Sequence, residues 1–440
     1  MKSLKHPVFV LFAIYILIAS SCNKGSDSTF ADTYDILARN EAYMLRMTAS
    51  GQKIARFSYA DDAIMHAIEL AGESGGSIHI GPGVFFFHSA VKLDHQIVIS
   101  GEGVNTKILP VDNYTDTCLF YGDSLNEVTL TNMKLTAAES EESQLSGIII
   151  KNSGSCLFRD LTLIGFSERG IWLTEDTFLS EVRGCRFADI GRSGVFLDQL
   201  NDIGRAGPYL PNLVSNCIFF RGGKGVECSD AIVANIVACM VFQSREPAFH
   251  INSASNSILI SGCRTFQIED DAVVVEDSHE IAITGNIFCW QIKNGIVLKG
   301  VDWGTISGNN IIDSGNIPFE FEGDEEWEYW QERPESTEEY QYCGLKIHSD
   351  SKGLTINGNA IFNWASNPPM TYGIYESEDC SDNIVIGNNI NYFTETGIHA
   401  LGNGTIVTDN IATSAAHRGN KESIHSFDTR LIEKFIEEIK

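Results

Sequence analysis

The chain has 440 residues, a formal net charge of −27 and 43% hydrophobic residues. A charge of this sign and size excludes nucleic acid and anionic membrane surfaces as partners, because both are polyanions. It does not exclude an acidic substrate, since a local cationic patch can lie within an acidic surface. The length suits one elongated repeat domain, because repeat folds escape the size limit of a globular core.

The N-terminus has the features of an export signal. Lys2 and Lys5 precede an apolar run over residues 8–18, which has signal-peptide length and is too short to span a bilayer. The run ends in IASSC at Cys22, a pattern that resembles a bacterial lipoprotein signal. This resemblance implies that residues 1–21 are removed, that Cys22 is acylated, and that lipid alone holds the exported protein at the outer membrane. A plain secretory signal is the alternative.

The remaining chain divides into two regions. We predict a polar tether over residues 22–40 and one folded domain over residues 41–440. Within that domain, DDAIMHAIELAGE at 61–73 has the pattern of an amphipathic helix. It runs into GGSIHIGPGVFFF at 75–87, and this block resembles the N-terminal signature of the pectate-lyase superfamily. The resemblance implies a right-handed parallel β-helix capped by the helix, and a carbohydrate-active protein, with lyases common among its relatives.

A repeat of about 23 residues fills most of the domain. Each unit opens with Gly or Ala and a strand pattern such as GIVLKG, and a second strand pattern follows about ten residues later. A coil this short cannot bury its own apolar face, so coils must stack about 4.8 Å apart. We therefore predict an all-β, single-stranded parallel β-helix of ten or more coils. The opening residues are Gly147, Gly170, Gly194, Gly225, Ala248, Ala272, Gly295, Gly344, Gly373 and Gly397.

Two further patterns fit stacked coils. One is a set of asparagines at nearly one place in the coil, whose amides can hydrogen-bond along the axis and tolerate left-handed backbone geometry. The other is an apolar stripe over residues 428–440 behind the N-cap Asp428, which predicts a helix that closes the last coil. The asparagines are Asn286, Asn309, Asn359, Asn388 and Asn410.

Ten cysteines lie beyond Cys22, and no pair has CxxC or metal-ligand spacing. Export permits disulfides. However, most of these cysteines fall at inward-pointing repeat positions, where Cys acts as a small buried hydrophobe. We therefore expect buried thiols. The ten are Cys118, Cys156, Cys185, Cys217, Cys228, Cys239, Cys263, Cys289, Cys343 and Cys380.

The repeat also predicts a surface. Counted from the opening Gly or Ala, positions one and three are apolar and point inward, so positions two and four face solvent. We call the two solvent-facing rows the floor. A cationic and polar cluster in an acidic protein predicts a site for a uronate-containing glycan there, with an ordinary solvated face as the alternative. The middle of the floor contains His250, Asn252, Glu276, Lys299, Lys346 and His348.

Longer coils predict walls beside the floor. They lie at residues 202–212, 316–343 and 363–372. The insertion at 316–343 is acidic and contains Trp327 and Trp330, so we predict a lid whose rings stack on a sugar. A decorative loop or a subunit contact is the alternative.

Three functions fit the floor, and the first is β-elimination at a uronate. This reaction needs a group that neutralises the carboxylate, a base for the C5 proton and an acid for the leaving oxygen. Lys299 or His348 is the candidate base, with its pKa set by Glu276, and Tyr375 is the candidate acid. The candidate neutralising groups are His250, Asn252 and Lys346.

The superfamily resemblance also bears on metal. Several relatives use Ca²⁺ held by carboxylates, which points to Asp270 and Asp271, beside Glu246 and Glu276, as candidate Ca²⁺ ligands. No other cofactor is indicated.

The second function is glycoside hydrolysis by two carboxylates. Asp198 and Glu227 fall on neighbouring coils, with backbones roughly 8 Å apart, within the range for inversion. The late insertion and coil number also resemble β-helical inulin fructotransferases, which use an acidic pair eleven residues apart. Glu227 matches the second member of that pair, but Asn216 stands at the first.

The third function is glycan binding without catalysis, which the fold also supports. The expected partner is a polysaccharide or oligosaccharide in all three cases. The protein itself is expected to be a monomer or a trimer that associates along its long faces.

Overall fold

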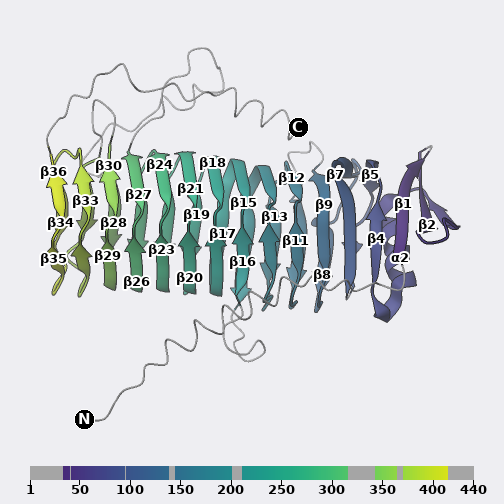
Figure 1. Ribbon diagram of the computed structural model, residues 1–440, viewed down its shortest axis with the longest axis horizontal. Helices are drawn as coiled ribbons and strands as arrows, with labels where there is room; N and C mark the ends of the chain where they lie inside the picture. The colour runs from purple at the N-terminus through teal and green to yellow at the C-terminus, as the bar shows by residue number, and fades with distance from the viewer. Residues whose placement is uncertain are drawn as a thin grey trace, which may run out of the picture.

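The computed structural model describes residues 33–39, 41–94, 96–137, 144–200, 211–315, 342–363 and 370–414. In this part of the chain, 36 strands form one continuous hydrogen-bonded sheet that winds into a stack of coils. Figure 1 shows the strands side by side along one long axis, with β1 and α2 at one end and β34 to β36 at the other. The expected signal, Cys22, the lid with Trp327 and Trp330, and the helix at 428–440 lie outside the described residues.

The first elements close the N-terminal end of the stack. Strand β1 pairs antiparallel with β2 and parallel with β4, and Asp35 in β1 accepts hydrogen bonds from Arg46 at 2.8 Å and Thr48 at 3.0 Å. The prediction of a tether reaching residue 40 is therefore wrong, because the strand at 33–39 belongs to the folded domain. These elements are β1 (Thr33–Arg39), β2 (Ala42–Met47), β3 (Lys53–Phe57), α2 (Ala60–Ala71), η1 (Gly72–Ser74), β4 (Gly76–Ile80), β5 (Gly83–Phe87), β6 (Val91–Lys92) and β7 (Ile97–Pro110).

The helix expected at 61–73 is α2, which ends at Ala71 before the short 3₁₀ turn η1. Its face containing Ala63, Ile64 and Ala67 is completely buried against the first strands. An apolar stripe at helical spacing therefore covers the open end of the coil stack, where a sheet would otherwise expose its core. No helix in the described part of the chain is long and apolar enough to cross a membrane.

The remaining described strands form three faces of the coil stack, and the strands within each face are parallel. The face with the floor consists of β8 (Cys118–Asp123), β10 (Ser146–Lys151), β13 (Arg169–Thr174), β15 (Arg186–Leu200), β17 (Ile218–Val237), β19 (Phe249–Asn252), β22 (Val273–Glu276), β25 (Ile296–Lys299), β28 (Cys343–His348), β31 (Tyr372–Glu376) and β34 (Thr396–Ala400). The long strands β15 and β17 turn a corner and so belong to more than one face.

The other two faces complete each coil. The second contains β9 (Thr129–Thr136), β11 (Leu157–Arg159), β14 (Glu181–Arg183), β16 (Asn212–Ser215), β20 (Asn256–Ser261), β23 (His279–Thr284), β26 (Asp302–Ser307), β29 (Lys352–Asn357), β32 (Ile384–Ile386) and β35 (Ile406–Thr408). The third contains β12 (Thr162–Ile164), β18 (Met240–Ser244), β21 (Arg264–Ile268), β24 (Ile287–Gln291), β27 (Asn310–Ser314), β30 (Ala360–Phe362), β33 (Asn389–Asn391) and β36 (Ile411–Thr413).

The core lies inside the coils, as the alternation of side chains predicts. Val273, Val275, Ile296 and Leu298, at positions one and three of their strands, are all 0% exposed. The opening glycines are explained by close approach at the corner before the strand. A Cβ at Gly344 would lie 2.2 Å from a methyl carbon of Ile361 on the third face, so only Gly fits there. The ten cysteines expected as core residues are all free and buried.

The asparagine ladder is present and buried. Asn309 Nδ2 donates to Asn359 Oδ1 at 2.9 Å, while Asn309 Oδ1 accepts from Asn286 Nδ2 at 2.9 Å. The expectation of left-handed geometry at the asparagines is wrong, because the positive φ lies at the residue before each, such as Gly308 at +63°. Earlier coils carry cysteine at the same place, and Cys263 N donates to Asn286 Oδ1 at 2.8 Å.

Candidate functional site

The predicted floor residues all lie on the outer side of the first face of the coil stack, in register from coil to coil. Successive coils pair their strands residue for residue, so equivalent side chains are neighbours along the axis. The row at position two contains Trp172, Phe196, Glu227, His250, Val274, Val297, Lys346, Tyr375 and His399. The row at position four includes Asp198, Ser229, Asn252, Glu276, Lys299 and His348.

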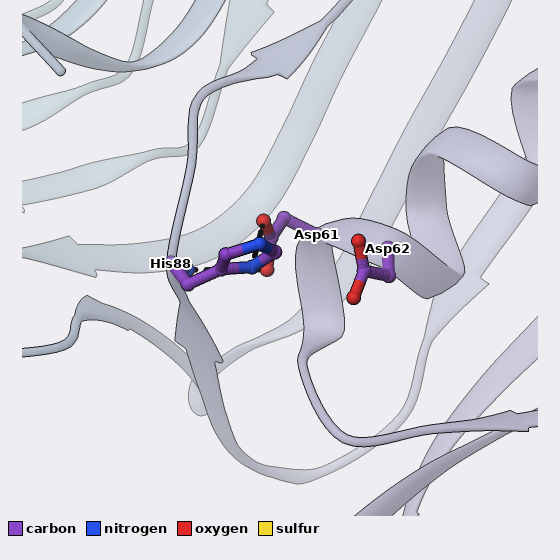
Figure 2. A group of neighbouring side chains, drawn as sticks. All are labelled: Asp61, Asp62 and His88. Carbon is purple, nitrogen blue, oxygen red and sulfur yellow. Dashed lines mark hydrogen bonds and ion pairs between the residues drawn. The ribbon is translucent and has the colours of Figure 1, made fainter.

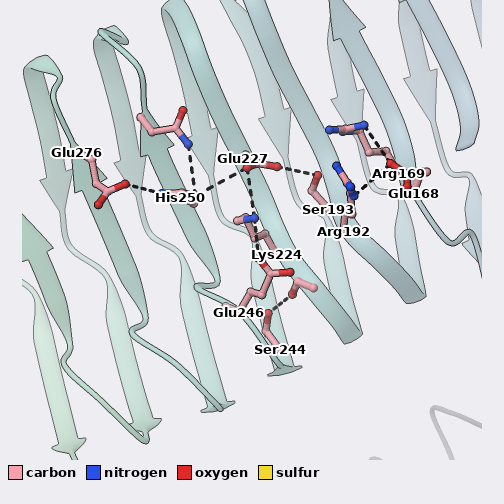
Figure 3. A network of polar contacts seen from close by, with 12 residues as sticks. Glu168, Arg169, Arg192, Ser193, Lys224, Glu227, Ser244, Glu246, His250 and Glu276 are labelled. Carbon is pink, nitrogen blue, oxygen red and sulfur yellow. Dashed lines mark hydrogen bonds and ion pairs between the residues drawn. The ribbon is translucent and has the colours of Figure 1, made fainter. Parts of the chain in front are cut away.

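A series of polar contacts crosses four coils in the middle of the floor, and Figure 3 shows it from Glu227 through His250 to Glu276. His250 Nδ1 lies 3.7 Å from Glu227 Oε1, and its Nε2 lies 3.4 Å from Glu276 Oε2. Glu276 Oε1 in turn accepts from Lys299 Nζ at 3.1 Å. Asn252 Nδ2 also contacts His250 Nδ1 at 3.4 Å. Both ring nitrogens of His250 therefore face protein groups, so this residue is held in place rather than directed at a ligand.

Of the two carboxylates in this series of contacts, Glu227 has the larger number of close polar partners. Burial alone raises its pKa, but contacts with His250, Lys224 and Ser193 outweigh burial and lower the pKa to about 2. Lys224 Nζ lies 3.3 Å from Glu227 and 2.6 Å from Glu246, and Ser193 donates to Glu227 at 3.1 Å. Glu227 is therefore ionised at neutral pH.

Three of the residues at this end of the floor escaped prediction. Arg169, Ser193 and Lys224 stand one residue before the opening glycines. The Arg169 guanidinium lies over the rings of Trp172 and Phe196, at 4.5 and 4.3 Å from their centroids. Strict alternation points this position inward, but the bend at the glycine turns it outward. Reading that position down the stack is the signal that finds these residues.

Asp198 lies beside this cluster with the opposite electrostatic tendency to Glu227. Its carboxylate is half-buried, and burial raises its pKa despite a 3.4 Å hydrogen bond from Thr174 Oγ1 and the nearby charge of Arg169. Two carboxylates on adjacent coils therefore differ in how readily they hold a proton.

The other half of the floor places an imidazole between two ammonium groups. Lys299 and His348 are register partners on adjacent coils, and Lys346 lies two residues before His348 on the same face. Burial, Lys346 and Lys299 all lower the pKa of His348, whereas its Nδ1 contacts Ser349 Oγ at 2.9 Å. Glu276 raises the pKa of Lys299. Lys299 is therefore held as a cation, which argues against it as a base.

Tyr375 follows Lys346 on the next coil. Burial, then the neighbouring Cys343 and Tyr372, raise the pKa of Tyr375, so its hydroxyl keeps its proton at neutral pH. The tyrosine is thus suited to donate a proton rather than to accept one.

The expected calcium ligands do not converge. Asp270 pairs with Lys293 at 2.8 Å, and Asp271 accepts from Asn294 N at 2.6 Å. Burial and then Asp270 raise the pKa of Asp271 to about 6. Glu246 is paired with Lys224. These carboxylates do not fit a Ca²⁺ site, which corrects the expectation from the superfamily resemblance.

Among the described residues, the one group of three metal-ligating side chains is Asp61, Asp62 and His88, shown in Figure 2. Asp61 is fully buried and accepts hydrogen bonds from the backbone N–H groups of His88 and Ser89 at 3.2 and 3.0 Å and from Ser89 Oγ at 2.8 Å, and pairs with His88 Nδ1 at 2.8 Å. Its oxygens are therefore already used. The group ties the first turn of α2 to the segment after β5.

Comparison with known proteins identifies the fold family. The family model described as a right-handed β-helix region matches residues 82–264 and 247–430. The chain belongs to this right-handed β-helix family. No curated protein sequence matches it.

Three solved structures of similar shape are remote in sequence. The A-module of the Azotobacter vinelandii mannuronan C-5 epimerase AlgE6 has a TM-score of 0.66 at 16% identity, covering 80% of this chain and 94% of that chain. The AlgE4 A-module from the same organism has a TM-score of 0.61 at 15% identity, with 81% and 95% covered. The catalytic domain of a GH87 α-1,3-glucanase has a TM-score of 0.50 at 13% identity, with 81% and 64% covered. At such identities the likeness extends to the fold alone.

Proposed function

We propose that this protein is a polysaccharide lyase that cleaves a uronate-containing glycan by β-elimination on the floor. One observation carries the proposal. The His348 imidazole, whose pKa is lowered, lies next to Lys299 and Lys346, and Tyr375 lies on the next coil. A neutral base, cations for a carboxylate and a protonated acid are the three groups that elimination needs.

Each group has one role. The His348 imidazole takes the C5 proton, and the electron pair of that bond becomes the C4–C5 double bond. Lys299 and Lys346 pair with the uronate carboxylate, which acidifies C5 and stabilises the charge that develops on it. The C4–O bond breaks, and the Tyr375 hydroxyl gives its proton to the departing oxygen. Glu276 fixes Lys299 through their 3.1 Å contact.

The structural neighbours support the choice of substrate. The two Azotobacter modules are named as mannuronan C-5 epimerases, and a change of configuration at C5 also begins with loss of the C5 proton. The floor of the present chain offers the groups for that step, and Tyr375 favours completion by loss of the leaving sugar.

Glycoside hydrolysis is the second candidate, favoured by the contrast between Asp198 and Glu227. Environments that push the pKa values of two nearby carboxyls apart are typical of an acid and a base. In this reaction Asp198 would protonate the glycosidic oxygen, and Glu227, with a pKa of about 2, would activate water.

Two variants separate these reactions. The full-length protein is incubated with a panel of uronate polysaccharides, and unsaturated product is followed by its ultraviolet absorbance while new reducing ends are counted. We expect absorbance to rise with at least one substrate, to be lost in His348→Ala and to persist in Asp198→Asn. Reducing ends without absorbance, lost in Asp198→Asn, would instead establish hydrolysis. If no substrate of the panel gives either signal, glycan binding without catalysis is the remaining function.

The N-terminal pattern supports an exported lipoprotein as part of the same proposal. Cells that express the chain and are fed radiolabelled palmitate should label the wild-type protein and not the Cys22→Ala variant. Labelling of both, or of neither, would contradict a lipid anchor at Cys22.

A further inference from the structure

Beyond Lys346 the floor ends in a compact group of three rings. Tyr372 and Tyr375 come from β31, and His399 comes from the next coil, in β34. The ring centroids of Tyr372 and His399 are 5.0 Å apart, and Tyr375 lies 5.4 Å from each of the other two rings. All three side chains are half-buried, so part of each remains accessible from the floor.

The register fixes where this ring cluster lies relative to the reacting sugar. Tyr375 is the Cα partner of Lys346 on one side and of His399 on the other. The cluster therefore begins one coil, about 5 Å, beyond Lys346, the nearer of the two lysines proposed to hold the uronate. A glycan laid along the floor would place its next sugar on the rings.

The Glu395 carboxylate adds negative charge beside Tyr372 in this cluster. After burial, Glu395 raises the pKa of Tyr372, whereas Asp379 acts to raise the pKa of both Tyr375 and His348 and so does not distinguish the rings from the lysines. A uronate carboxylate placed on Tyr372 would meet the negative charge of Glu395. The C–H face of an uncharged sugar would instead gain contact with aromatic carbon.

We propose that Tyr372 and His399 form a subsite for an uncharged sugar, next to the uronate held by Lys299 and Lys346. The substrate is then a glycan in which uronate alternates with a neutral sugar. This proposal rests on the proposed function, because that function places the uronate at the lysines.

The test compares binding of two hexasaccharides to the full chain carrying His348→Ala, which prevents turnover. One is an oligogalacturonate, and the other alternates galacturonate with rhamnose. Calorimetry should show about tenfold tighter binding of the alternating chain, which is the size expected of one good aromatic contact. Tyr372→Ala combined with His399→Ala should remove that preference, while Tyr372→Phe, which keeps the ring, should retain it.

The matched control is Trp303→Ala, which removes a ring that is 61% exposed on β26, on the second face. It should leave both affinities unchanged, and thermal melting should show that all variants are folded. Equal binding of both hexasaccharides, tighter binding of oligogalacturonate, binding of neither, or a preference that survives loss of both rings would overturn the subsite.

Failure of the subsite and failure of the lyase are distinguishable. Preference for the alternating chain without unsaturated product from the wild-type protein retains the subsite and removes the lyase. Unsaturated product from the wild-type protein, with no effect of the ring substitutions, retains the lyase and removes the subsite.

Discussion

At the scale of residues, the environment of His348 decides whether it can serve as a base. Burial and two neighbouring ammonium groups disfavour the imidazolium, so the pKa in the folded protein lies below the ordinary value for histidine. The neutral form therefore predominates at neutral pH. Activity that depends on it should rise with pH through this lowered pKa and then level off.

Removal of one lysine should shift the pH range over which this activity rises, which is the acid limb of the pH profile. Lys346→Gln deletes a like charge next to His348, so we expect the pKa of His348 to rise and the acid limb of kcat/KM to move to higher pH. An NMR titration of the histidine resonances measures the same change without relying on activity. Lys352→Gln, which removes a lysine paired with Asp302 on the second face, is the control. An unchanged His348 titration in Lys346→Gln would contradict the assigned coupling.

Glu227 tests the separation of positioning from chemistry. Under the proposed elimination, Glu227→Gln loosens His250 but leaves His348 and the lysines intact. We therefore expect kcat/KM to fall about tenfold, with an unchanged dependence on pH. Steady-state kinetics across pH measures both quantities. Complete inactivity in this variant, with a loss as large as that of His348→Ala, would shift the assignment toward carboxylate catalysis.

At the scale of elements, the asparagine ladder ties successive turns together. Asn309→Ala removes two donated and two accepted hydrogen bonds with the neighbouring coils, all between buried groups. We expect a loss of about 3 kcal/mol in the free energy of unfolding, because buried partners are left unpaired. Asn310→Ala, at the exposed next residue, should change stability by less than about 0.5 kcal/mol. Urea unfolding compares them, and equal effects would deny the ladder a structural role.

The N-terminal cap offers a second matched pair. Asp61→Asn puts an amide where one oxygen now accepts from Ser89 N, Ser89 Oγ and His88 Nδ1, so we expect a clear fall in melting temperature. Burial and the charge of Asp61 raise the pKa of Asp62, which means that its ionised form is disfavoured in the fold. Asp62→Asn should therefore melt at the same or a higher temperature. A lower melting temperature for Asp62→Asn than for Asp61→Asn would contradict the role of Asp61 in joining α2 to the segment after β5.

At the scale of the whole molecule, periodicity made the fold and the floor predictable. A fixed repeat and a strict alternation suffice to place His250, Glu276 and Lys346 on one face, because the parallel register carries each position from coil to coil. Local exceptions could not be predicted in this way. The bend at each opening glycine turns Arg169 and Lys224 outward, against the alternation.

The partners of the charged side chains could not be predicted from the sequence either. The superfamily resemblance implied a calcium site at Asp270 and Asp271. Their partners Lys293 and Asn294 lie one coil away and become neighbours only through stacking. Likewise, residues 33–39 fell within the predicted tether, because the pairing of this strand with β2 depends on contacts that the sequence pattern does not show.

We propose that the floor removes a C5 proton and breaks the C4–O bond of a uronate. Proton NMR of the products from one active uronate oligosaccharide tests it most directly. We expect a vinyl proton at C4 of the new non-reducing end in the products of the wild-type protein, and no such proton with His348→Ala. A new reducing end without a vinyl proton, or an inverted C5 centre in an intact chain, would contradict it.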